Sequence, residues 1–396
     1  MGKEMIIKSI CVVTDRYPTE QYPVNTFLDQ LVCQFSEQGV RCTVIAPYSP
    51  VRDIVKRKNY HPGRHWVKKT KNGFEVDVYC PHIPMLTGRK IAGVNFSDMY
   101  VKLSCRAIET VIKKENIQFD VLYAHFICPA GLVAAKLSEK YEKPFFVAYG
   151  ESSIDLIKRN YSLDIIAKRL SNISGIISVS AKNKMELLNN HVANEEKIGV
   201  FPNSIDTFSF HCMDKIKLRK QYGIDLQFFI VAFVGDFIER KGSRRVSEAI
   251  EKLDGVYSFF IGAGDQKPEC KGILHMGRVP HNKIVHYLNM ADAFVLPTQS
   301  EGCCNAIIEA MACGLPVISS NGEFNDDILN DACSIRIDPN NVEEIAYAIE
   351  KLKADVELRK SMSAAALRQA AGLTLDKRAS AILQFMNEKV EKEGRA

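Results

Sequence analysis

The sequence EGCCNAIIEAMACGLPV, residues 301–317, carries the strongest structural signal in the chain. It follows the apolar run 293–296, and its pattern predicts a strand, a tight loop, a helix, a turn and a second strand. Two strands that are joined by a crossover helix lie parallel in one sheet. The stretch therefore predicts an α/β unit with a parallel sheet.

The same alternation of short apolar strands and amphipathic helices continues on both sides of this stretch. In the first half we expect strands at 6–13, 42–46, 74–79, 121–124, 145–148 and 175–179, with helices near 98–115, 130–141 and 181–191. In the second half we expect strands at 229–234, 257–262, 273–276, 293–296, 316–319 and 334–337. The pattern predicts two doubly wound, Rossmann-like α/β domains, each with its ligand edge at the carboxyl ends of the strands.

The segment Val200 to Asp206 separates the two alternations. It contains a proline and an Asn-Ser turn signal, and an irregular stretch follows it. We therefore expect an N-terminal, acceptor-binding domain over 1–203 and a C-terminal domain over 204–375. We expect residues 376–396 to form a helix that packs back toward the N-terminal domain.

The composition excludes several classes of protein. The 396 residues exceed what one core usually organises, and 46% hydrophobic with 25% charged residues indicates a globular chain. A net charge of +5 is too small and too dispersed to indicate a nucleic-acid-binding protein. No apolar run approaches the ~20 residues of a membrane helix, and the first residues do not resemble a signal peptide. We therefore expect a cytoplasmic protein whose twelve cysteines are reduced thiols.

A basic segment runs from Arg52 to Lys71 and contains the single tryptophan, Trp66. Such a segment suits a surface that faces phosphates or anionic lipid headgroups, which would place the protein at the inner membrane face as a peripheral protein. A solvated basic loop fits the sequence equally well.

The loop and helix of residues 301–317 have the chemistry of a diphosphate site. Gly302 allows the backbone to approach a ligand, and Asn305 is an expected N-cap, so free N–H groups and the helix dipole face an anion. Glu309, one turn later, reaches ribose hydroxyls, and Glu301 accepts hydrogen bonds from sugar hydroxyls. An ordinary strand-to-helix turn with two exposed acids has the same local spacing.

The E-x7-E spacing of Glu301 and Glu309 in this setting resembles the donor-binding motif of retaining GT-B glycosyltransferases of glycosyltransferase family four, which includes bacterial capsule and lipopolysaccharide enzymes. The resemblance implies a GT-B fold, with two Rossmann-like domains facing a central cleft. It implies retaining transfer of a sugar from a UDP- or GDP-linked donor to a glycan or polyprenyl-diphosphate-linked acceptor in cell-surface polysaccharide synthesis. No cofactor beyond the nucleotide sugar is expected.

The sequence VGDFIERKG, residues 234–242, resembles the diphosphate clamp of the family. Lys241 matches the lysine that stabilises the departing phosphates, although a solvent-exposed lysine would look the same. Asp236 occupies the place where many relatives carry an arginine. We expect Arg240 to supply the second cation.

Two further segments resemble the family's donor domain: FIGAGD at 260–265 and MGRVP at 276–280. The first is no dinucleotide fingerprint, because Lys267 replaces the third glycine, and this disfavours a hydride-transfer enzyme. The resemblance assigns donor binding to Gly235, Gly262, Gly264, Val279, Gly302, Cys303, Cys304, Asn305 and Glu309.

In the first half, LYAHFICPAG at 122–131 resembles the family's segment with a histidine near the transferred sugar, which makes His125 the first-domain candidate. A structural histidine at a strand end is the alternative. Residues Tyr149 to Ser152 replace the family's His-Gly-Ser-Asp-like turn and put the acceptor side in doubt.

The expected catalytic residues are thus His125, Arg240, Lys241 and Glu301. The chain has no D-x-D dyad, and the family usually replaces the charge of a metal with cations and amides, so we expect no metal site. Two alternatives stay open at this point. They are a catalytically silent GT-B scaffold that binds sugars, and a nucleotide-sugar 2-epimerase on a similar fold.

Overall fold

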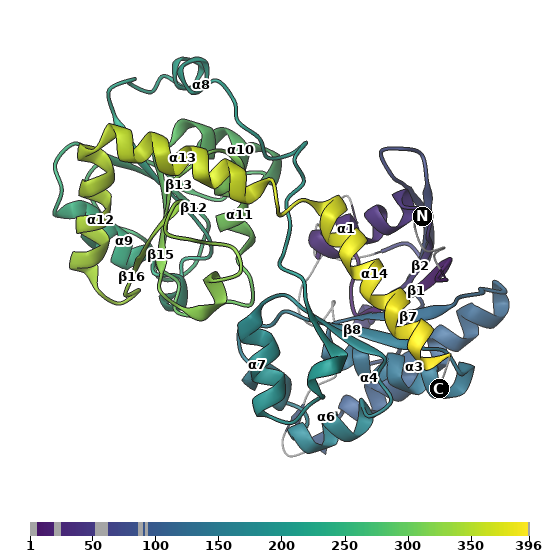
Figure 1. Cartoon of the computed structure of the whole chain (residues 1–396). Helices are drawn as coiled ribbons and strands as arrows, with labels where there is room; N and C mark the ends of the chain where they lie inside the picture. The colour runs from purple at the N-terminus through teal and green to yellow at the C-terminus, as the bar shows by residue number, and fades with distance from the viewer. Residues whose placement is uncertain (1–5, 20–24, 52–61, 86–89, 92–93, 395–396) are drawn as a thin grey trace. The chain divides into compact units, whose positions relative to one another are not determined.

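The computed structural model describes residues 6–19, 25–51, 62–85, 90–91 and 94–394. The chain forms two compact units (Figure 1). The N-terminal unit comprises Met1–Phe201 together with Leu375–Ala396, and the C-terminal unit comprises Pro202–Thr374. The sequence-based boundaries at 203/204 and 375/376 lie one or two residues from these.

The described part of the N-terminal unit is built on an eight-stranded sheet with the order β10-β9-β8-β7-β1-β2-β4-β3. All neighbouring strands pair in parallel except β3, which runs antiparallel to β4. The strands are β1 (Ser9–Thr14), β2 (Arg41–Ile45), β3 (His65–Lys69), β4 (Glu75–Tyr79), β7 (Val121–His125), β8 (Phe145–Tyr149), β9 (Gly175–Ser178) and β10 (Ile198–Val200). A separate two-residue pair joins β5 (Lys90–Ile91) to β6 (Val94–Asn95).

Helices cover both faces of this sheet, as a doubly wound fold requires. One apolar core receives buried side chains from α3 (Ser97–Lys114), α4 (Leu132–Tyr141), α6 (Leu163–Arg169) and α7 (Ala181–Asn189). The core on the opposite face receives them from α1 (Thr26–Glu37) and the C-terminal α14 (Leu375–Glu393). The short α5 (Asp155–Lys158) follows β8.

The C-terminal unit is built on a six-stranded parallel sheet with the order β13-β12-β11-β14-β15-β16. Its strands are β11 (Phe229–Val234), β12 (Val256–Ile261), β13 (Ile273–Gly277), β14 (Ala293–Leu296), β15 (Val317–Ser320) and β16 (Ser334–Ile337). Its helices are α8 (Lys215–Gln221), α9 (Ser243–Glu251), α10 (His281–Met290), α11 (Asn305–Ala312), α12 (Val342–Ala354) and α13 (Val356–Ala370). Short 3-10 turns at Glu239–Lys241 and Glu323–Asn325 complete it.

The predicted α/β class and the two doubly wound sheets are confirmed. Four strands were not predicted: the short β5 and β6, the strand β10, and β3, which part of the basic segment, His65–Lys69, forms at the edge of the sheet. Residues 52–61 of that segment lie outside the described residues. None of the helices in the described ranges is both long and apolar enough to cross a membrane.

Candidate functional site

A pocket of about 500 Å³ opens at the carboxyl ends of β11 and β12 and beside the start of α11, all within the C-terminal unit. This is the edge at which open parallel sheets bind ligands. The structure brings nine of the sequence-predicted residues into its lining, namely Gly235, Lys241, Gly262, Val279, Glu301, Cys303, Cys304, Asn305 and Glu309.

Close packing beside the pocket requires glycine at two positions of the loop after β12. A Cβ atom on Gly262 would lie 1.9 Å from the Gly235 carbonyl oxygen, and one on Gly264 would lie 2.2 Å from the Phe237 carbonyl oxygen. The loop after β12 therefore fits against the loop after β11 only without side chains at these two positions. Gly264 is not part of the pocket lining, but it packs against the backbone of Phe237 in the loop after β11.

Three predicted residues, Arg240, Lys241 and Glu301, form one ion-pair cluster. Glu301 Oε1 lies 2.6 Å from Lys241 Nζ and 2.6 Å from an Arg240 terminal nitrogen. Thr298 also donates its hydroxyl to this oxygen at 2.9 Å. Arg240 donates further to the Ser300 carbonyl, so its guanidinium is directed to this cluster and is not part of the pocket lining.

The cluster keeps its members charged. Burial acts to raise the pKa of Glu301, but the charges of Lys241 and Arg240 outweigh it and hold that pKa below its usual range. For Lys241, burial acts to lower the pKa, and the contacts with Cys304 and Glu301 outweigh it, so the net pKa is raised. Lys241 is thus a half-buried, permanent cation in the pocket wall.

The start of α11 differs in detail from the prediction. Cys304 is the N-cap residue and Asn305 is the first helical residue, with no side-chain cap bond. The expectation of Asn305 as N-cap is therefore wrong by one position, because its backbone already has helical geometry. Within the described residues its Oδ1 atom is buried and has no hydrogen-bond partner. A buried amide oxygen of this kind, in a pocket wall, is available to a ligand.

The two cysteines of the pocket lining have different surroundings. Burial raises the pKa of the Cys304 thiol, and Lys241 only partly offsets this. Cys303 has a structural contact, because the backbone N–H of Asn203 donates to its sulfur at 3.3 Å. The Asn203 side chain also donates to the Cys303 carbonyl at 3.0 Å. The segment expected as a domain boundary thus holds the loop that precedes α11.

Sequence reasoning missed His281, the first residue of α10, which lines the pocket. Its Nε2 atom lies 3.7 Å from Glu309 Oε1, and this interaction raises the pKa of His281. Its ring also packs edge-on against Phe210, with 5.4 Å between the centroids. Its place at the start of the helix after β13, on the ligand edge of the sheet, is the signal that could have found it.

His125 lies in the N-terminal unit, at the end of β7, and only 4% of its surface is exposed. Burial, with a smaller contribution from Arg378, lowers its pKa to about 3, so the imidazole is neutral. Its Nδ1 atom lies 3.4 Å from the Tyr123 hydroxyl. Its Nε2 atom is buried without a partner in the part of the chain that the structure describes.

Family comparisons match both units. The model described as Glycosyltransferase Family 4 matches residues 24–208, and the model described as Glycosyl transferases group 1 matches residues 214–369. The putative teichuronic acid biosynthesis glycosyltransferase TuaC of Bacillus subtilis (strain 168) is 27% identical over 86% of this chain and 87% of its own length. The capsular polysaccharide biosynthesis glycosyltransferase CapM of Staphylococcus aureus is 29% identical over 47% of this chain and 54% of its own length.

Solved structures share the fold. Sucrose-phosphate synthase from Thermosynechococcus elongatus has a TM-score of 0.76 at 16% identity, over 97% of this chain and 100% of that one. Anabaena HepE in complex with UDP and glucose has a TM-score of 0.70 at 15% identity, over 96% of this chain and 99% of that one. Each unit described above therefore has the α/β architecture of a GT-B protein.

Proposed function

Because the chain belongs to glycosyltransferase family four, we propose that it is a retaining hexosyltransferase of cell-surface polysaccharide synthesis. The donor is a UDP- or GDP-linked sugar, and the acceptor is a glycan or a polyprenyl-diphosphate-linked oligosaccharide. No divalent metal is needed. Two observations on relatives support the class: TuaC is named for teichuronic acid biosynthesis, and HepE was solved with UDP and glucose.

The observation that carries the proposal is the pocket at the ends of β11 and β12, where Lys241, Glu309 and the start of α11 meet. A nucleoside diphosphate sugar requires cations and N–H groups for its phosphates, and acceptors for its ribose hydroxyls. Lys241 and the α11 amides supply the first, and Glu309 supplies the second. The unpartnered Asn305 Oδ1 atom supplies a further acceptor.

The ion-pair cluster supports one order of events when the donor enters. In the structure Glu301 pairs with both Lys241 and Arg240, and the three side chains together keep one net positive charge. The donor diphosphate competes with Glu301 for Lys241, and Glu301 is then released to accept hydrogen bonds from the transferred sugar. As the sugar–phosphate bond breaks, Lys241 and the α11 dipole stabilise the growing negative charge. The acceptor hydroxyl oxygen bonds to the anomeric carbon from the face that the diphosphate leaves, so the anomeric configuration is retained. A phosphate oxygen of the departing diphosphate takes the proton of that hydroxyl.

The acceptor side rests on fewer contacts. Neutral His125 donates or accepts one hydrogen bond through its free Nε2 atom, which suits a sugar hydroxyl. The location follows from the acceptor: the protein works in the cytoplasm and touches the inner membrane face peripherally. Exposed Val67 on β3 and exposed Phe74, beside the basic side chains of 64–71, support this contact.

A thermal-shift screen of the full chain with UDP, GDP and ADP, in buffer with EDTA, tests the proposal. We expect one nucleotide to raise the melting temperature, since a ligand at 100 times its Kd stabilises the native state by about 2.7 kcal/mol. Glu309→Ala should abolish most of the shift, because the ribose loses its acceptor. Glu248→Ala on α9 is the matched control, since Glu248 is an exposed helical carboxylate outside the pocket lining.

Each other outcome has a definite meaning. A shift that Glu309→Ala leaves intact places the nucleotide elsewhere and contradicts the proposed site. If no nucleotide shifts the melting temperature, the chain is a GT-B scaffold without donor binding. A shift that appears only when Mg²⁺ replaces EDTA contradicts the proposal that no metal is needed.

A further inference from the structure

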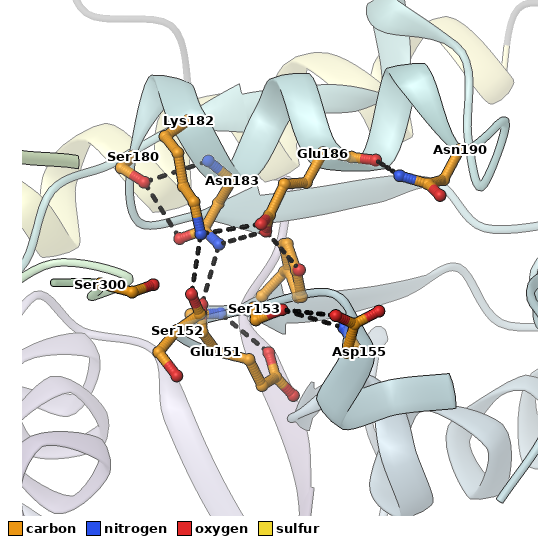
Figure 2. Close-up of polar contacts among 12 residues, drawn as sticks. Glu151, Ser152, Ser153, Asp155, Ser180, Lys182, Asn183, Glu186, Asn190 and Ser300 are labelled. Carbon is orange, nitrogen blue, oxygen red and sulfur yellow. Dashed lines mark hydrogen bonds and ion pairs between the residues drawn. The ribbon is translucent and has the colours of Figure 1, made fainter. Parts of the chain in front are cut away.

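A second polar cluster lies in the N-terminal unit, at the carboxyl ends of β8 and β9 and at the start of α7 (Figure 2). We call it the β8–α7 cluster, and its members are Tyr149, Glu151, Lys182, Asn183 and Glu186. Figure 2 shows the α7 side chains turned toward the loop that begins at Glu151. This is the ligand edge of the sheet, as the pocket described above is for the other unit.

The negative charge of one carboxylate in the cluster, Glu186, is balanced by a lysine and by hydrogen-bond donors. Lys182 Nζ lies 2.8 Å from it and the Tyr149 hydroxyl donates to it at 2.8 Å. Asn183 donates to it at 3.2 Å. Lys182 also donates to the Ser152 carbonyl at 2.8 Å. The charge of the lysine is therefore already balanced.

The other carboxylate, Glu151, is not compensated. Its Oε2 atom accepts a hydrogen bond from the Gly150 N–H at 3.1 Å. No lysine, arginine or histidine among the described residues pairs with it, although the side chain is half-buried. Asn183 donates to the Glu151 carbonyl at 2.9 Å and fixes the backbone that carries the side chain. The carboxyl group is thus held in place without a counter-charge.

The protonation of Glu151 changes near neutral pH. Burial raises the pKa of Glu151 to about 7. The charge of Glu186 adds a smaller increase, and hydrogen bonds from backbone N–H groups partly offset the rise. Two titratable groups beside it, Cys128 and Tyr149, stay protonated in this range. Burial raises the pKa of Cys128 to about 12 and raises that of Tyr149 well above its usual value, while Lys182 remains paired with Glu186.

A structural role does not require this carboxylate. Glutamine has the same shape and would accept the Gly150 N–H without the free-energy cost of a half-buried, unpaired charge. Uncompensated titratable groups at the ligand edge of a sheet are typical of functional sites. When Glu151 is ionised the cluster carries one net negative charge, which repels phosphates and carboxylates and attracts hydroxyl donors.

We propose that Glu151 accepts a hydrogen bond from a hydroxyl of a neutral sugar in the acceptor glycan, and that this edge rejects anionic sugars. The inference rests on the proposed transferase function and narrows its acceptor. The sugar bound here is uncharged, and any diphosphate of a lipid-linked acceptor lies away from Glu151.

Binding of methyl glycosides to the full chain tests this without a donor. The probes are the methyl glycosides of glucose, galactose and N-acetylglucosamine, and of glucuronic acid as the anionic counterpart, with Kd measured by NMR titration. At pH 8 we expect a neutral glycoside to bind at least tenfold more tightly than the glucuronide. Between pH 8 and pH 6 the affinity of the neutral glycoside should fall about tenfold, because Glu151 becomes protonated.

The variant Glu151→Gln should weaken binding of the neutral glycoside about tenfold at pH 8, since a charge-assisted hydrogen bond becomes a neutral one. It should also remove the pH dependence and reduce the discrimination against the glucuronide. Asp155→Asn is the matched control, because Asp155 lies nearby on α5 but is exposed and paired with Lys158 at 3.0 Å. This control should bind as the unmodified chain does.

Three results overturn the inference. In the first, no neutral glycoside binds. In the second, the glucuronide binds as tightly as its neutral counterpart. In the third, the pH dependence of binding persists in Glu151→Gln. None of them depends on the pocket of the C-terminal unit. A failed nucleotide screen with intact glycoside binding would refute the transferase function alone, and the reverse pattern would refute the role of Glu151 alone.

Discussion

At the scale of single residues, the glycines after β12 show how tightly the pocket wall is built. Gly264 faces the Phe237 backbone, where a Cβ atom would come within 2.2 Å of the carbonyl oxygen. Backbone atoms cannot move aside as the end of a flexible side chain can. The loop at Gly235 is different, since a Cβ atom there would meet nothing closer than 3.6 Å.

We therefore predict that Gly264→Ala destabilises the C-terminal unit by about 3 kcal/mol, the upper range for overpacking. Its melting temperature should fall by about 6 °C or more. Gly235→Ala serves as the control and should change the melting temperature by much less. Equal effects of the two substitutions in differential scanning calorimetry would contradict the packing argument.

The grouping of residues at the pocket was predictable from the sequence where it depends on their spacing along the chain. The spacing of Glu301 and Glu309 placed both acids at one pocket. The partners of Glu301 were not predictable, because Lys241 and Arg240 are remote in sequence and meet it only through the fold. The lack of a counter-ion at Glu151 was not predictable either. It depends on the packing of β8, β9 and α7 together.

At the scale of elements, α14 acts as a structural part of the N-terminal unit. It lies along α1, and its residues Ile382, Leu383 and Met386 are buried in the core beneath β1 and β7. Its Phe385 ring fills the space beside Gly175 and, together with Phe201, the space beside Gly199. The helix thus replaces side chains that β9 and β10 lack.

We predict that Ile382→Ala lowers the stability of the N-terminal unit by about 2–5 kcal/mol, because the side chain is fully buried and its removal leaves a cavity. The expected readout is faster amide exchange across residues 1–201. Gln384→Ala, on the exposed side of the same helix, is the control. Exchange that speeds up in α14 alone, with β1 and β7 unchanged, would show that the helix does not support this core.

Strands of the two sheets were predicted well where they are buried on both faces, since such strands are continuous apolar runs. The strands β11 and β14, which are buried along their whole length, lie at the predicted residues. The strand β3 was missed, because an edge strand with alternating exposed basic side chains has the composition of a loop. Its pairing with β4 is a tertiary contact that composition does not reveal.

At the scale of the whole molecule, the chain divides its chemistry between two units. Every residue that lines the candidate donor pocket belongs to Pro202–Thr374. The β8–α7 cluster and His125 belong to the unit that contains Met1–Phe201. A ligand that contacts only one unit should stabilise that unit more than the other. The reason is that a ligand stabilises the native structure to which it binds.

We therefore predict that the nucleotide found in the thermal screen slows amide exchange mainly in segments 235–242, 278–284 and 301–309, which form the pocket wall. At 100 times the Kd, amides there that exchange by opening of the unit should slow by up to about 100-fold. Glu309→Ala with the same nucleotide should show no such protection. Protection confined to residues 1–201 would place the nucleotide on the other unit, and the donor role of Lys241 and Glu309 would then be wrong even if the enzyme transfers sugars.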